Sequence, residues 1–117
     1  MISHAPDHLL FIEPTRPASA VPVIDALTRR MTGAWRERAT SLVAYDGVHM
    51  CTACSSTSDS EDHFVITTDG RELLTNSLAI HYLAYHRDEV PAAELAKVAS
   101  LAAEMWEPTV DEMIGER

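Results

Sequence analysis

Two cysteines and one pair of histidines constrain this chain more than any other feature. Cys51 and Cys54 form a C-x-x-C pattern, and His81 and His86 form an H-x4-H pattern after a gap of 26 residues. Two thiolates and two imidazoles suit the tetrahedral coordination that Zn2+ prefers, and structural zinc sites are often assembled from two such ligand pairs. The pattern therefore predicts a structural Zn2+ site whose ligands are Cys51, Cys54, His81 and His86.

The spacing of the two histidines places a condition on the helix that carries them. His81 and His86 are five positions apart, which separates them by about 140° on an ideal helix. We therefore expect one of the two ligands near a helix end, where the last turn tightens to 3-10 geometry. The gap between the ligand pairs exceeds that of a ββα zinc finger, and a second hairpin at about 63–74 would account for the additional residues.

The residues alone leave other interpretations of the site open. The cysteines and histidines can be buried without a metal. A C-x-x-C can also act as a redox dithiol, although that motif begins a helix, and a loop rich in Ser and Asp follows Cys54. A catalytic metal would need an open coordination position, with Glu61 or Asp62 as the general base, whereas a Cys2His2 set fills all four positions. His49 would share a strand face with Cys51, which makes it a candidate ligand or hydrogen-bond partner of a ligand.

Apolar residues recur at helical spacing in three parts of the chain. The resulting predicted helices span 21–31, 77–87 and 91–107, and a last turn includes Val110, Met113 and Ile114. Pro22 suits the first turn of the first helix, and Thr32-Gly33 is expected to end it. Trp35 would then begin a new short element.

Turn signals and β-branched runs predict a β-hairpin region near 43–74, including a hairpin around Asp69-Gly70. The predicted fold class is therefore α+β, with a small β-hairpin region and about three helices. In this prediction zinc joins the two parts in a ββα or treble-clef-like core.

The length of the chain argues for one domain with an N-terminal extension. Residues 1–20 contain three prolines and are predicted to form an extended N-terminal arm, whereas residues 21–117 are predicted to be a single zinc-binding domain. No run of about 18 apolar residues occurs, so we expect no membrane-spanning helix. Residues 1–14 lack a basic leader followed by an apolar core, so we expect a cytoplasmic protein with reduced thiols.

Charged residues are unevenly distributed along the chain. Residues 1–40 contain five arginines against four acidic residues, residues 41–117 contain 14 acidic residues against four basic ones, and the net charge is −9. Since nucleic-acid affinity depends on Lys and Arg, the acidic half disfavours phosphate binding. A nucleic-acid-associated regulator is the alternative function, acting through a small basic patch of Arg29, Arg30, Arg36 and Arg38.

The favoured function is a protein-interaction module with an unknown protein partner. The apolar residues near the C-terminal end predict an apolar stripe, which either packs onto the first helix or contacts a partner, including a second copy of the chain in a homodimer. These residues are Met105, Trp106, Met113 and Ile114. No Ser-His-Asp order, phosphate-binding glycine loop or paired carboxylate motif occurs, so no catalytic residue is predicted.

The segments GVHMCTAC (47–54) and TNSLAIHYLAYHRDEVP (75–91) resemble a set of short uncharacterised bacterial proteins. The shared pattern consists of a G-x-H-x-C knuckle, a T-N-S-L helix start and an H-Y-x-x-x-H-R-x-E-V-P end, and it covers about residues 45–100. The resemblance supports the predicted set of four ligands and implies a role for His49. It implies no particular activity, and homology to eukaryotic C2H2 DNA-binding fingers does not follow from it.

Overall fold

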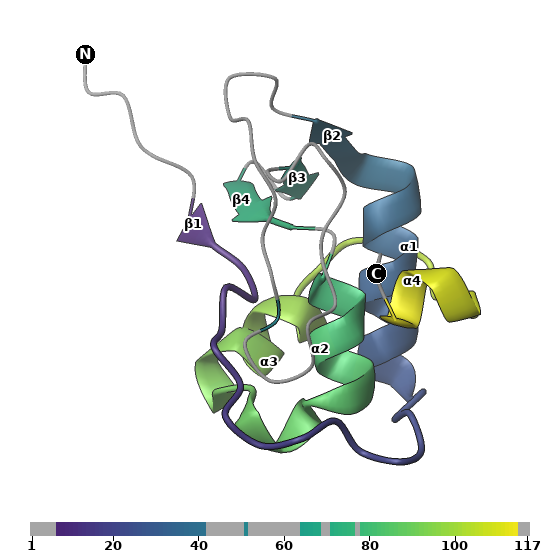
Figure 1. Ribbon diagram of the computed structural model, residues 1–117. Helices are drawn as coiled ribbons and strands as arrows, with labels where there is room; N and C mark the ends of the chain where they lie inside the picture. The colour runs from purple at the N-terminus through teal and green to yellow at the C-terminus, as the bar shows by residue number, and fades with distance from the viewer. Residues whose placement is uncertain (1–6, 42–50, 52–63, 69–70, 77, 115–117) are drawn as a thin grey trace.

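The structure is a computed structural model that describes residues 7–41, 51, 64–68, 71–76 and 78–114. It has the predicted α+β fold, with the strands gathered at one end of the molecule and helices α2 and α3 at the other (Figure 1). In chain order the elements are β1 (Asp7–His8), α1 (Ala26–Arg38), β2 (Ala39–Ser41), β3 (Phe64–Thr68), β4 (Arg71–Thr75), α2 (Ala79–Tyr85), the 3-10 helix η1 (Arg87–Glu89), α3 (Ala92–Ala99) and α4 (Val110–Ile114).

The described strands form one sheet in the order β1-β4-β3-β2. β3 and β4 pair antiparallel, with Val65 opposite Leu74 and Ile66 opposite Leu73, which confirms the predicted hairpin. β2 adds to β3 antiparallel, and β1 adds to β4 parallel. Neighbouring residues of a strand point to opposite faces, and both Val65 and Ile66 are buried. The hairpin is therefore covered on both of its faces.

α1 begins at Ala26, later than its apolar spacing predicts. The carboxylate of Asp25 accepts hydrogen bonds from the backbone N–H groups of Leu27 (3.1 Å) and Thr28 (3.2 Å). This is the geometry of an N-cap residue, which satisfies backbone donors that have no partner within the helix. The start of α1 is therefore set by a carboxylate cap rather than by Pro22.

The predicted end of this helix at Thr32-Gly33 is wrong. The helix continues through Gly33, and Trp35 lies inside it instead of beginning a new element. A Cβ atom added at Gly33 would lie 1.7 Å from the backbone oxygen of Glu104. Gly33 therefore permits the close approach of another backbone segment, and its role is in packing rather than in ending the helix.

α3 ends at Ala99, well before the predicted end at residue 107. Leu101 is buried, but Met105 is 52% exposed, so the apolar stripe of the predicted helix does not continue. The chain instead crosses α1 without regular secondary structure and then forms α4, which confirms the predicted last turn with Val110, Met113 and Ile114. We refer to residues 101–114 as the C-terminal strap.

Residues 9–25 run along the helices before α1 begins (Figure 1). Leu9 and Leu10 are fully buried in the core. Leu10 has a φ of 59°, which leucine rarely adopts. Hydrogen bonds hold it on both sides: its N–H donates to Glu94 (2.8 Å), and its carbonyl accepts from Nδ2 of Asn76 (3.3 Å). These contacts make the start of this extended segment part of the folded core.

Candidate metal centre

Cys51, His81 and His86 lie together in the core. One potential ligand atom of each residue lies within 4.8 Å of those of the other two. The three residues are almost inaccessible to solvent, with exposed fractions of 1%, 2% and 4% respectively. His81 belongs to α2, and His86 is the residue directly after it. Three of the four predicted ligands are therefore brought to one place, where they could hold a metal ion.

The separation of the cysteine sulfur from the nearest imidazole matches that of two ligands on one metal ion. Sγ of Cys51 lies 3.5 Å from Nε2 of His86. Zinc bonded at about 2.3 Å to sulfur and about 2.0–2.1 Å to nitrogen, with tetrahedral angles, separates these ligand atoms by about 3.6 Å. The rings of His81 and His86 are also close, with centroids 5.0 Å apart. Cys51 and His86 are therefore placed to share one ion, and a ring nitrogen of His81 lies within 4.8 Å of both ligand atoms.

The second nitrogen of His81 has a defined partner. Nδ1 of His81 lies 2.8 Å from the backbone carbonyl oxygen of Met113 in α4. Because a carbonyl oxygen can only accept, Nδ1 carries the proton and donates the hydrogen bond. The lone pair of the neutral ring is then on Nε2, as in histidine ligands whose other nitrogen donates to a carbonyl. Nε2 is therefore the nitrogen through which His81 can bind a metal.

The end of α2 determines where the His86 side chain points. His86 is the C-cap residue of α2, with φ of −129° and ψ of 34°, and the 3-10 helix η1 begins with the next residue. This departure from α-helical geometry brings two histidines five positions apart to one site, in the way that the spacing predicts. Two carbonyl groups in the last turn of α2 accept hydrogen bonds from the N-terminal segment: that of Ala84 from Val23 (2.8 Å) and that of Tyr85 from Ser19 (3.0 Å).

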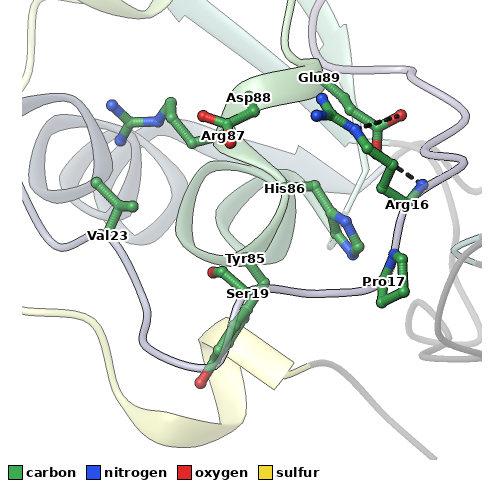
Figure 2. Close-up of a pocket in the computed structure, with 9 residues that line it drawn as sticks. All are labelled: Arg16, Pro17, Ser19, Val23, Tyr85, His86, Arg87, Asp88 and Glu89. Atoms are coloured by element: carbon green, nitrogen blue, oxygen red, sulfur yellow. Dashed lines mark hydrogen bonds and ion pairs between the residues drawn. The ribbon is translucent and has the colours of Figure 1, made fainter.

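Arg87 anchors η1 to the start of α1. Its guanidinium donates two hydrogen bonds of 2.7 Å to the carboxylate of Asp25 and one of 2.9 Å to the hydroxyl of Thr28. The hydrogen bond from Arg87 outweighs the opposing effect of burial and holds the pKa of Asp25 well below its usual range. Figure 2 shows Arg87 directed away from the ring of His86. The ion pair therefore positions the end of α2 without entering the candidate metal centre.

Burial lowers the pKa of His86 below its usual value, and the nearby carboxylate of Glu89 only partly offsets this effect. A neutral imidazole at neutral pH keeps the lone pair that a metal requires. His86 also lines a surface hollow of about 220 Å³ between the N-terminal segment and residues 85–89 (Figure 2). The N-terminal segment contributes Arg16, Pro17, Ser19 and Val23. Arg16 lies in the wall of this hollow, with its Nε atom 3.9 Å from Oε1 of Glu89. The hollow therefore approaches the metal centre from the His86 side and carries charges of both signs.

The other predicted members of the site are not placed by the structure. Cys54 and His49 lie outside the described residues, as does the rest of the predicted hairpin region from 43 to 63 apart from Cys51. Cys54 as the fourth ligand therefore stays a prediction. Conversely, sequence reasoning does not find the carbonyl group of Met113, because every residue has a backbone carbonyl and its position depends on the path of the chain.

Three of the four arginines of the predicted basic patch contact the C-terminal strap. The guanidinium groups bind carboxylates and backbone carbonyls of that segment, which leaves less of their hydrogen-bonding capacity for a phosphate. The described contacts are Arg29 with Glu107, Arg36 with Glu112, and Arg30 with the carbonyl oxygens of Leu101 and Ala103. The side chain of Arg38 lies outside the described part of the structure.

Comparison of the chain with protein-family models, with curated proteins and with solved structures gives no match. Among the described residues, no helix combines the length and the apolar character needed to cross a membrane. The function proposed below therefore rests on the residues of the candidate metal centre.

Proposed function

We propose that the protein binds one Zn2+ ion through Cys51, His81 and His86, with Cys54 as the fourth ligand, and that the ion stabilises the fold. The observation that carries this proposal is the buried group of one sulfur and two imidazole nitrogens within 4.8 Å of one another. Thiolate and imidazole ligands suit zinc, whereas Mg2+ and Ca2+ prefer oxygen ligands. The C-x-x-C spacing supports Cys54, since cysteines three positions apart commonly bind one zinc ion.

The location of the centre supports a structural role. Cys51 and His86 are 35 positions apart in the chain, with the β3-β4 hairpin between them. An ion at this site would join the segment before the hairpin to the end of α2, and it would act on stability because a complete site does not exist in the unfolded chain. The exposed fractions of the three side chains do not exceed 4%, so the surface hollow beside His86 gives a substrate little access to the ligand atoms.

We further propose that this metal-stabilised fold serves as a protein-interaction module in the cytoplasm. The described large apolar side chains that are exposed include Met105, Trp106 and Val110 of the C-terminal strap, and exposed apolar groups are common at contact surfaces. The alternative of a nucleic-acid-associated regulator has less support, because three of its four arginines are bonded within the chain. Binding of generic DNA that weakens steeply with salt would favour that alternative.

Substitution of Co2+ for zinc tests the ligand set directly. Tetrahedral Co2+ absorbs visible light far more strongly than six-coordinate Co2+, and thiolate ligands add charge-transfer absorption in the near ultraviolet. We expect a tetrahedral spectrum for the wild type and a weaker charge-transfer band in both Cys51→Ser and Cys54→Ser. The control Glu72→Ala alters an exposed residue of β4 and should leave the spectrum unchanged. A six-coordinate spectrum, or a Cys54→Ser spectrum identical to that of the wild type, would contradict the proposed ligands.

A further inference from the structure

We propose that metal binding and docking of the C-terminal strap on α1 are one linked equilibrium, so that the strap is a metal-controlled element of the fold. This inference rests on the proposed function, because it requires a metal at the centre formed by Cys51, His81 and His86. It adds that residues remote from the ligands set the metal affinity. The two effects are thermodynamically reciprocal. The factor by which docking of the strap strengthens metal binding equals the factor by which bound metal strengthens docking.

The link between the two is the hydrogen bond between His81 and Met113. Met113 belongs to the strap and is buried, and its carbonyl oxygen accepts a hydrogen bond from Nδ1–H of His81 at 2.8 Å. A carbonyl acceptor on the remote nitrogen orients a histidine ligand and raises the basicity of the nitrogen that binds the metal. A metal on Nε2 in turn holds the ring in place and strengthens Nδ1–H as a donor. Docking of α4 and occupation of the metal centre therefore favour each other.

The middle of the strap depends on a single glycine of α1. A Cβ atom at position 33 would lie only 1.7 Å from the backbone oxygen of Glu104, so any residue other than glycine would clash with the strap. Beside this crossing, the backbone N–H of Trp106 donates to the carbonyl of Arg29 at 3.0 Å. The indole N–H of Trp106 donates to Glu37 at 2.8 Å. The strap therefore rests directly on the backbone of α1, and a methyl group at position 33 would displace it.

Leu101 and Met113 bury the two ends of the strap in the core, whereas the side chains of α1 hold the part between them by polar, partly exposed contacts. Arg36 donates to the carboxylate of Glu112 (2.9 Å) and to the backbone oxygen of Glu107 (3.0 Å). Arg30 donates to the carbonyl of Leu101 at 3.2 Å. Exposed ion pairs contribute little individually to stability, and segments held by such contacts open at lower free energy than the core. The part of the strap between Leu101 and Met113 is therefore held weakly enough for the hydrogen bond of Met113 to His81 to affect its docking.

The test compares zinc affinity, measured by competition with a chromophoric chelator, in the wild type and in Gly33→Ala. This substitution touches no residue of the metal centre, and alanine is a better helix former than glycine, so α1 itself is not weakened. We expect zinc to bind Gly33→Ala at least about 10-fold more weakly, the range seen when a partner of a ligand is lost. Glu72→Ala, which is exposed and remote from the strap, should bind zinc as the wild type does.

The outcomes separate this inference from the proposed function. Failure of the wild type to bind zinc would remove the proposed function and the inference with it. Zinc binding by the wild type with unchanged affinity in both Gly33→Ala and Gly33→Ala/Arg36→Gln would overturn the inference alone. If Gly33→Ala does not fold, Arg29→Gln/Arg36→Gln takes its place, because it removes the ion pairs with Glu107 and Glu112 together and leaves the helix backbone intact. Unchanged zinc affinity in that variant would likewise overturn the inference.

Amide hydrogen exchange of the wild type measures the reverse direction of the linkage. We expect a chelator to accelerate exchange of the Trp106 amide, which is bonded to α1, by a larger factor than exchange of the β3 amides. Equal acceleration in both places would mean that the strap has no separate link to the metal, and this would overturn the proposal.

Discussion

The two ring nitrogens of His81 have different roles in this structure. Nδ1 donates to the carbonyl of Met113, and Nε2 is the nitrogen that can bind a metal. We expect NMR of 15N-labelled protein to show the His81 ring protonated on Nδ1, with the Nε2 resonance moving when zinc is added. Protonation on Nε2 in the folded protein would contradict the assignment of this ligand atom.

Cys51 supplies a thiolate that serine cannot replace, because a hydroxyl is a poor zinc ligand at neutral pH. Cys51→Ser should therefore lose most of the stabilisation that zinc provides, which is about 3 kcal/mol when free zinc is 100 times the wild-type dissociation constant. Urea unfolding in that zinc concentration measures the loss, and Glu72→Ala serves as the exposed control. Equal unfolding midpoints for Cys51→Ser and the wild type, in zinc and in chelator alike, would refute the metal centre.

The sequence predicts the described part of the centre because cysteine and histidine are chemically distinctive. Cys51, His81 and His86 follow from residue type and spacing alone, and the structure brings them together. The hydrogen bond to Met113 could not be predicted in this way. It joins a side chain to a backbone atom 32 positions away, and only the folded path of the strap creates it.

At the scale of elements, the pair formed by Asp25 and Arg87 connects the start of α1 to η1. Arg87 holds the pKa of Asp25 below its ordinary value, so the ionised carboxylate is favoured in the folded chain. The stability from this pair is complete above the unfolded pKa of about 4 and is lost as the pH falls through the lower folded pKa. Because Asp25 is partly exposed, we expect only about 1 kcal/mol from the pair at neutral pH.

Asp25→Asn isolates this effect, since asparagine keeps an N-cap acceptor but carries no charge. The wild type should be more stable than Asp25→Asn at pH 7, and the difference in urea midpoint should shrink as the pH falls from about 5 to about 2. A difference that stays constant over this range would show that the charge of Asp25 does not stabilise the fold.

The ends of elements were harder to predict than their existence. The β3-β4 hairpin and α2 follow from β-branched runs, turn residues and apolar spacing, and the structure contains both. Gly33 resembles a helix stop in the sequence, but it is the point where Glu104 crosses α1. α3 ends at Ala99 although apolar spacing continues, because the strap follows α1 instead. Both differences arise from a contact between distant segments, which local periodicity does not contain.

At the scale of the whole molecule, the metal adds to a hydrophobic core that already exists. The buried core includes residues from the N-terminal segment, α1, the hairpin and α2, among them Leu9, Met31, Ile66 and Leu83. A chain of 117 residues is long enough to bury a modest core without a metal. Zinc is therefore expected to raise stability without being the sole cause of folding.

Thermal unfolding followed by circular dichroism tests this balance. A chelator should lower the midpoint of the wild type while most of the helical signal persists at low temperature. Loss of the helical signal on chelation would mean that the metal creates the fold, and an unchanged midpoint would mean that no bound metal supports it.

The most direct test of the central claim is the metal content of purified protein, measured by elemental mass spectrometry for the wild type and His86→Ala. His86 is chosen because its Nε2 lies 3.5 Å from the sulfur of Cys51, a separation that suits two ligands of one ion. We predict about one zinc per chain in the wild type and little or none in His86→Ala. Wild-type protein that is purified without chelator and contains no metal, or zinc retained equally in His86→Ala, would contradict the proposed metal centre.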